Sequence, residues 1–202
     1  MHYLAFDTET TGFGPSAKIV ELSVVCFTDG QVVEEWEQLF WPGDIDWEKA
    51  QGAFNVNGLS REKLQGKPTF GDIQDEVTRR LGGEKVWVAH NTPFDMGMLK
   101  QEFELLRVTM PEPAFALDTM MLDAVCDKYR KGSRKLDAVA GVWGVDFGSE
   151  AHRAAADAAV CGKVLWSMLQ SGKLPPNIEA IHRMQVERRK DWNAYVKRKY
   201  GD

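Results

Sequence analysis

The sequence predicts an α/β protein whose helices flank a central mixed β-sheet. Three observations support this fold class. A strand-like N-terminal segment precedes a β-hairpin, so the first three strands are expected to be antiparallel neighbours. Beyond the hairpin, short apolar strands alternate with segments of helical periodicity. The 202 residues, 44% of them hydrophobic and 27% charged, have the length and composition of one globular domain with at most a terminal appendage.

Five strands are expected from their branched and aromatic residues. The first covers residues 2–7 and ends in a polar cluster. The next two, residues 19–27 and 32–41, flank Asp29-Gly30, a pair that favours the tight turn of a hairpin. Shorter apolar segments predict the last two strands, at residues 86–89 and 115–117.

Helices are expected where apolar residues recur every three or four positions. Residues 70–81 show this spacing until Gly82 interrupts it, and Pro93 suits the first turn of another helix. The predicted helices cover residues 60–64, 70–81, 93–106, 119–129, 135–142, 153–170 and 178–200. Apart from the short helix at 60–64, the chain from Pro42 to Pro68 is predicted to be a long irregular surface connection, because glycine and asparagine recur in it.

Pro175-Pro176 is the predicted boundary of the main domain. We therefore expect one domain over residues 1–174 and a basic helical extension over residues 175–202. Residues 183–199 hold seven basic and two acidic side chains, which suits a helix that follows a nucleic-acid backbone or docks on an acidic partner. The alternative is a solvated helix that packs its apolar face on the domain. That face would consist of Ile178, Ile181, Met184, Trp192 and Tyr195.

The composition also disfavours several classes of protein. No apolar run reaches the roughly 18 residues of a membrane span, and the N-terminus lacks the basic region and cleavage site of a secretory signal. Cys26, Cys126 and Cys161 are odd in number and far apart, which disfavours disulfides and a zinc knuckle. We therefore expect a cytoplasmic protein without membrane contact. The net charge of −5 does not exclude a nucleic-acid ligand, because local charge decides such binding.

The first candidate site lies where the first strand ends, in the motif DTETTG at residues 7–12. Side chains two positions apart on a strand point to the same side, so Asp7 and Glu9 are expected to converge. Two converging carboxylates repel each other unless a cation lies between them or one is protonated. The pair is therefore a candidate metal site, with a solvated pair at a loop entrance as the alternative.

Two further motifs carry ionisable side chains. In HNTPFD, at residues 90–95, Asp95 follows an apolar strand and starts a helix, where an acid also interacts favourably with the helix dipole. In HRAAAD, at residues 152–157, the five-residue offset would place His152 and Asp157 about 140° apart on a helix, so the histidine is expected on the loop or first turn. An imidazole there suits a general base, although loop histidines are often without such a role.

Together the three motifs resemble the DnaQ-like (DEDDh) exonuclease family. The resemblance spans about residues 2–171, includes the Lys-Leu-Asp stretch at 135–137, and matches the histidine branch through the five-residue spacing of the third motif. It implies a ribonuclease H-like three-layer fold. It also implies a 3′-to-5′ exonuclease that releases nucleoside 5′-monophosphates, with residues 1–174 as the exonuclease domain.

The resemblance also implies roles for individual residues. Asp7, Glu9, Asp95 and Asp157 match the metal-binding carboxylates, and His152 matches the general base. Hard oxygen ligands favour two Mg²⁺ ions, for which Mn²⁺ substitutes, and such a pair stabilises charge on the attacking and leaving oxygens. In this scheme Asp7 bridges the ions while Glu9 and Asp157 hold the one beside the nucleophilic water. His152 deprotonates that water, and Asp95 acts through coordinated water.

Substrate contacts are expected just after the first motif and around the second. Phe13 and Phe94 are candidates to stack on bases, with ordinary packing as the alternative. The expected substrate-binding residues are Thr10, Thr11, Gly12, Phe13, Asn91 and Phe94. One departure from the family concerns residues 57–59, which read Asn-Gly-Leu where many relatives carry His-Gly-Ile.

Single-stranded DNA with a free 3′ end is the favoured substrate. RNA or a short oligoribonucleotide is the first alternative, because selection between sugars depends on contacts near the terminal 2′ position. A non-catalytic nucleic-acid-binding module is the second, and the presence of all five motif residues disfavours it. The family resemblance further implies a homodimer, whereas the sequence identifies no polymerase partner.

Overall fold

The computed structural model describes residues 1–83, 86–147 and 153–200. A five-stranded sheet of order β3-β2-β1-β4-β5 lies at its centre. The strands β1, β2 and β3 pair antiparallel, whereas β4 and β5 run parallel to β1. The predicted α/β class with three antiparallel N-terminal strands is therefore confirmed. The strands are β1 (His2–Thr10), β2 (Ile19–Thr28), β3 (Gln31–Leu39), β4 (Val86–Ala89) and β5 (Phe115–Asp118).

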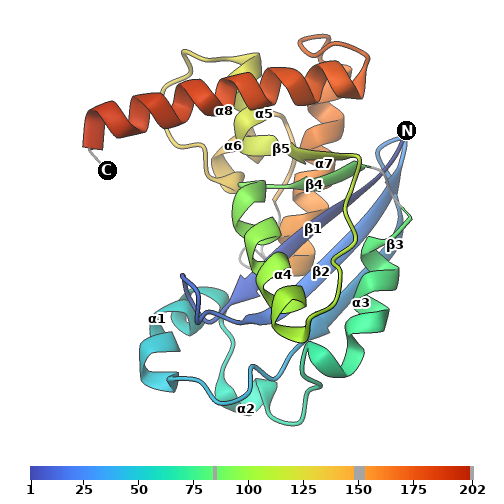
Figure 1. The fold of residues 1–202 in the computed structure, drawn as a ribbon. Coiled ribbons are helices and arrows are strands. Elements are labelled where there is room, and N and C mark those ends of the chain that lie inside the picture. The colour runs from blue at the N-terminus through green and yellow to red at the C-terminus, as the bar shows by residue number, and fades with distance from the viewer. Residues whose placement is uncertain (84–85, 148–152, 201–202) are drawn as a thin grey trace.

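Helices cover both faces of the sheet (Figure 1). The side chains of β1 alternate between two cores, since Tyr3 and Ala5 face one layer of helices while Leu4 and Phe6 face the other. The first layer contains α5 (Thr119–Cys126), α6 (Leu136–Val142) and α7 (Ala154–Gln170). The second contains α3 (Gln74–Leu81), preceded by a 3₁₀ turn at Gly71–Ile73, and α4 (Thr92–Leu106). The last helix, α8 (Ile178–Tyr200), lies along β5 and α5.

The connection between β3 and α3 is more regular than predicted. It holds α1 (Trp47–Asn57) as well as the expected short helix α2 (Arg61–Leu64). The side chain of Asp46 caps α1 by accepting a hydrogen bond from the backbone of Lys49, and Gly58 ends the helix in the left-handed region at φ 68°. The expectation of an irregular segment was wrong because few residues of α1 are buried, which hides its periodicity.

The hairpin between β2 and β3 turns at the predicted pair. Asp29 and Gly30 both have positive φ, 48° and 79°, as a two-residue turn of the type I′ class requires. A Cβ atom on Gly30 would lie 2.4 Å from the ring of Trp166 on α7, so glycine also allows the turn to approach that helix.

Several boundaries differ from the sequence prediction. The strand β1 continues to Thr10, three residues beyond its predicted end, and α5 stops at Cys126 instead of residue 129. Within the described ranges, none of the helices combines the length and apolar character needed to cross a bilayer.

Candidate active site

Three carboxylates meet at the carboxyl end of β1. Asp7 and Glu9 lie two residues apart in the extended strand and point toward the α7 layer, and Asp157 enters from the first turn of α7. One carboxylate oxygen of each residue lies within 4.8 Å of the other two. All three side chains are half-buried. The convergence predicted for Asp7 and Glu9 is therefore present, and Asp157 joins them.

Asp95 approaches this group from the opposite layer. It lies in the first turn of α4 and is only 2% exposed. Its Oδ1 accepts hydrogen bonds from the backbone nitrogen of Thr8 at 3.0 Å and from Thr8 Oγ1 at 2.7 Å. Because Thr8 stands between Asp7 and Glu9 on β1, this anchor fixes Asp95 beside the pair, with one of its oxygens already engaged. The structure thus brings all four predicted carboxylates to one edge of the sheet.

The charges of these carboxylates oppose one another. Burial raises the pKa of Asp7 well above its usual value, and repulsion from Asp95, Asp157 and Glu9 raises it further. Burial, followed by repulsion from Asp157, raises the pKa of Glu9 to about 7. Burial likewise raises the pKa of Asp95 to about 7, although the hydrogen bonds from Thr8 favour its charged form.

These residues fit a hard divalent cation. The three-residue group offers only carboxylate oxygens, the ligands that Mg²⁺ and Mn²⁺ prefer. A cation placed among them would remove the repulsion that raises the pKa values of Asp7 and Glu9. The cluster is therefore costly for the metal-free protein and complementary to a bound cation.

This cost leads to a stability prediction for Glu9→Gln. The ordinary pKa of this carboxyl is 4.5 and the folded protein raises it to about 7, so its charge opposes folding above pH 7. The metal-free variant should therefore be on the order of 2 kcal/mol more stable at pH 8, which raises Tm by about 4–8 °C. Below pH 4.5 the carboxyl is protonated in both states, so the gain should appear only as the pH rises from 4.5 to 7.

Thermal unfolding in chelator at pH 4 and pH 8 measures this effect. Glu35→Gln, at an exposed position of β3, is the matched control and should leave Tm unchanged. A Glu9→Gln protein that is less stable than the parent at pH 8 would contradict the electrostatic account of the cluster.

Two residues beside Glu9 were missed as site residues. Glu21 is its direct partner in the register of β1 and β2 and is 2% exposed. Its pKa rises to about 8 through burial and through a hydrogen bond with Glu37, so the protonated Glu21 donates to Glu37. The antiparallel pairing of β1 with β2 was predicted, but its register, which places Glu21 opposite Glu9, was not. The hydrogen bond that Arg153 donates to Glu37 at 3.3 Å ties this pair to the start of α7.

Asn57 supports the first motif from the end of α1. Its side-chain nitrogen donates to the carbonyl oxygen of Thr10 at 3.4 Å, and its side-chain oxygen accepts from the backbone of Leu59 at 3.0 Å. A further hydrogen bond to Glu9 favours the charged form of that carboxyl and so lowers its pKa. Asn57 thus contacts the Glu9 carboxylate from residues 57–59, the segment in which this sequence departs from the family pattern.

A cavity of about 430 Å³ adjoins these residues, and its wall contains both acidic and basic side chains. Glu21 and Asn57 link it to Glu9, while Lys63 and Arg153 place cationic groups at the same cavity. The lining consists of Glu21, Leu39, Val56, Asn57, Gly58, Leu59, Lys63 and Arg153.

The residues predicted to contact substrate lie around the rim of the site. Phe13 is 85% exposed, and its ring centroid is 5.5 Å from that of Phe94, which makes an aromatic pair at the surface. The hydroxyl of Thr10 donates to the carbonyl of Gly12 at 2.9 Å, and the hydroxyl of Thr11 accepts from the backbone of Lys18 at 2.9 Å. These two threonines shape the turn that presents Phe13.

Asn91 begins α4 in the left-handed region at φ 65°, a conformation that asparagine tolerates. Its backbone nitrogen donates to Asp118 Oδ1 at 3.2 Å, and its side chain is exposed. Asp118 in turn caps α5 through the backbone nitrogens of Met120 and Met121. Asn91 is therefore held by its backbone, which leaves its side chain facing solvent.

His152, the predicted general base, lies outside the described residues, so its role stays a prediction. The other histidine of the motifs, His90, has both ring nitrogens engaged, one with Thr119 Oγ1 and one with the carbonyl oxygen of Arg134, each at 2.8 Å. Burial lowers the pKa of His90, which favours the neutral imidazole. His90 thus joins β4 to the loop before α6.

Comparison with known protein families adds an independent observation. A family model described as an exonuclease matches residues 4–165. Among curated proteins, the PolC-type DNA polymerase III of Lacticaseibacillus paracasei is 29% identical over 170 residues, covering 82% of this chain and 11% of that protein. The same polymerase of Halalkalibacterium halodurans is 28% identical over 169 residues, covering 83% and 11%. The chain thus spans about a tenth of the length of these relatives.

Solved structures share the same fold. Exonuclease X in complex with 5′ overhanging duplex DNA has a TM-score of 0.67 and 20% identity, covering 91% of this chain and 99% of that chain. The nuclease domain of 3′hExo, a DEDDh family member bound to rAMP, gives 0.70 and 18%, covering 85% and 92%. The E. coli ExoI–ssDNA complex gives 0.72 and 15%, covering 85% and 41%. This likeness confirms the predicted ribonuclease H-like layered fold.

Proposed function

Since the chain belongs to the exonuclease family, we propose that it is a 3′-to-5′ exonuclease that acts on single-stranded DNA and releases nucleoside 5′-monophosphates with two divalent cations. The observation that carries this proposal is the meeting of Asp7, Glu9 and Asp157, with oxygens within 4.8 Å of one another, beside the anchored Asp95. These four side chains come from three separate elements of the fold. A non-catalytic module would have no need to maintain such repulsion.

Each acidic residue has a distinct task in this proposal. Asp7, Glu9 and Asp157 would hold Mg²⁺ or Mn²⁺, which when bound supplies positive charge at the attacking and leaving oxygens of the phosphodiester. Asp95, with Oδ1 fixed by Thr8, orients water at the edge of the cluster. The hydrogen bond from Asn57 favours the charged form of Glu9. His152 accepts the proton of the attacking water, as the third motif predicts.

The surroundings of the cluster support a nucleotide as the ligand. The cavity of about 430 Å³ beside Glu9 is large enough for a nucleoside, and Lys63 and Arg153 in its wall attract phosphate. The exposed Phe13, paired with the half-buried Phe94, offers a ring surface on which any base can stack. The terminal nucleotide would therefore lie between this cavity and the aromatic pair.

DNA is favoured because the curated relatives are DNA polymerases and two of the structural relatives are complexes with DNA. Digestion of matched DNA and RNA strands labelled at the 5′ end tests this choice. A ladder of shortened DNA with released nucleoside 5′-monophosphates, dependent on Mg²⁺ or Mn²⁺ and slower in Ca²⁺, is the expected result. Degradation of RNA with survival of DNA would overturn the choice of substrate, and turnover in excess chelator would overturn the metal mechanism.

Assembly and location stay predictions. The family resemblance implies a homodimer, which the mass of the protein in solution would decide. Cytoplasmic location is one of these predictions. A polymerase partner, suggested by the PolC-type relatives, is tested by identifying the proteins that bind this chain in cells.

A further inference from the structure

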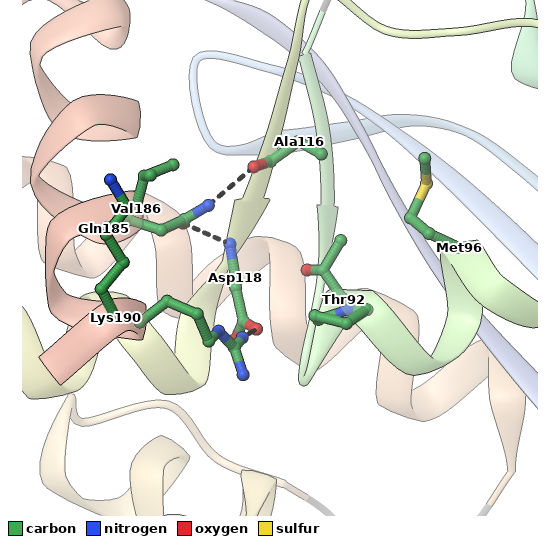
Figure 2. A pocket seen from close by; sticks show the side chains of 9 residues that line it. Thr92, Met96, Ala116, Asp118, Gln185, Val186 and Lys190 are labelled. Atoms are coloured by element: carbon green, nitrogen blue, oxygen red, sulfur yellow. Dashed lines mark hydrogen bonds and ion pairs between the residues drawn. The ribbon is translucent and has the colours of Figure 1, made fainter. Parts of the chain in front are cut away.

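The helix α8 is fastened to the outer edge of β5 by side chains that replace a neighbouring strand. The amide of Gln185 donates to the carbonyl oxygen of Ala116 at 2.8 Å and accepts from the backbone nitrogen of Asp118 at 2.7 Å (Figure 2). Arg189 adds an ion pair with the buried carboxylate of Asp118. These contacts satisfy the backbone of an edge strand and fix the helix in place.

The order of the contacts along α8 gives its direction. His182 lies against Phe115, the first residue of β5, with ring centroids 5.7 Å apart, and Arg189 pairs with Asp118, the last residue. The helix therefore runs in the direction of β5 and passes the carboxyl edge of the sheet near Arg189. The remainder of α8, as far as Tyr200, extends roughly 16 Å further. In Figure 1 this end projects on the side toward which β1 runs, and the carboxyl end of β1 carries Asp7 and Glu9 of the candidate active site.

A basic stripe follows this projecting helix. Arg183, Lys190 and Lys197 are spaced seven residues apart, which places them on one side of α8, and all three are exposed. In total α8 carries seven basic and three acidic residues, although the whole chain has a net charge of −5. The stripe is thus a local cationic surface on an acidic protein.

A groove connects this stripe with the first turn of α4. A cavity of about 350 Å³ lies between α8, β5 and α4, and Pro93, Met96 and Val186 form apolar parts of its wall (Figure 2). Lys190 lines the same cavity and belongs to the basic stripe. The turn of α4 that borders the cavity also carries Asp95 of the candidate active site.

Resting on the proposed exonuclease function, we propose that this groove and the stripe of Arg183, Lys190 and Lys197 bind the substrate strand on the 5′ side of the nucleotide being removed. The cations attract the phosphates, and the apolar wall accommodates a base. A nucleic-acid strand suits this surface better than an acidic protein, because the cationic stripe and the apolar groove meet at Lys190 and lead to the helix turn that carries Asp95.

The test compares long and short substrates in variants with reversed charge. Binding of a strand of about 15 nucleotides is measured by fluorescence anisotropy in an Asp7→Asn background, so that hydrolysis does not consume the probe. The double substitution Lys190→Glu and Lys197→Glu should weaken binding about 10-fold and reduce the slope of log affinity against log salt by about 1.4. Lys190→Arg should retain affinity. Lys67→Glu, at an exposed site after α2, is the matched control.

Hydrolysis of a dinucleotide by the same variants, with Asp7 intact, separates this surface from the active site. A dinucleotide offers the stripe only one phosphate, so its kcat/KM should fall far less than the affinity for the long strand. If the double variant binds the long strand as tightly as Lys67→Glu does, the proposal is wrong, and an acidic protein becomes the partner expected for the stripe. A loss of kcat/KM on the dinucleotide equal to the loss of affinity for the long strand would also overturn the proposal. Failure of the parent to degrade any strand would instead refute the proposed function, while the binding comparison would still test the stripe.

Discussion

Replacing Asp7 with asparagine is expected to lower kcat/KM on single-stranded DNA by at least about 1,000-fold. Asp7 is the carboxylate on which Asp95, Asp157 and Glu9 all act, so it lies at the centre of the cluster. Asparagine preserves its shape and removes its charge, which weakens the attraction for a divalent cation. The measurement is the initial rate of mononucleotide release at saturating Mg²⁺.

The control for this variant is Asp137→Asn, which changes an exposed acid in the first turn of α6, outside the candidate site. It should digest DNA at the parental rate. Because Asp7→Asn relieves repulsion within the cluster, the variant should remain folded, and thermal unfolding checks this. Digestion at the parental rate by folded Asp7→Asn protein would remove the proposed mechanism.

Replacing His152 with alanine is expected to lower kcat by about 100- to 10,000-fold with little change in KM. The third motif predicts that this imidazole deprotonates the attacking water, so its loss should affect the chemical step more than substrate binding. In the parent, kcat should fall as the pH drops and the imidazole becomes protonated, because only the neutral ring accepts a proton. The variant should lack this acid limb.

The pH profile must be measured at saturating Mn²⁺. The pKa values of Glu9 and Asp95 are raised to about 7 in the metal-free protein, so loss of metal would otherwise imitate the loss of a base as the pH falls. His2→Ala is the matched control, since this exposed histidine interacts with Thr28 away from the site. An unchanged acid limb in the His152 variant would assign the general base to another group.

Local chemistry made much of the fold predictable. The turn at Asp29-Gly30 has the backbone conformation that its residue types favour, and the hairpin then sets the antiparallel order of three strands. Tertiary contacts decided the rest. The helix α1 is held by packing of Phe54 and its cap at Asp46, and Gln185 binds a strand that lies 69 residues earlier in the chain. The caps of α1 at Asp46 and Gly58 are local signals that the sequence prediction did not use, whereas the contact of Gln185 with β5 has none.

The candidate site was likewise predictable in part from local sequence, while the rest depends on tertiary contacts. The alternation of side chains on a strand was enough to predict that Asp7 and Glu9 converge. The meeting of Asp95 and Asp157 with that pair depends on α4 and α7 packing against opposite faces of β1, so it could be expected only from the family resemblance. The place of Glu21 follows from the register of β1 with β2 once that is known, whereas the bond from Asn57 to Glu9 requires the position of α1.

Anomalous scattering from Mn²⁺ in a crystal of the protein with a bound nucleoside 5′-monophosphate is the most direct measurement of the acidic cluster. We predict two peaks within bonding reach of Asp7, with Glu9 and Asp157 coordinating and the nucleotide phosphate beside them. Peaks that lie away from Asp7, or full Mn²⁺ occupancy elsewhere with none among these carboxylates, would contradict the assignment of this cluster as the catalytic metal centre.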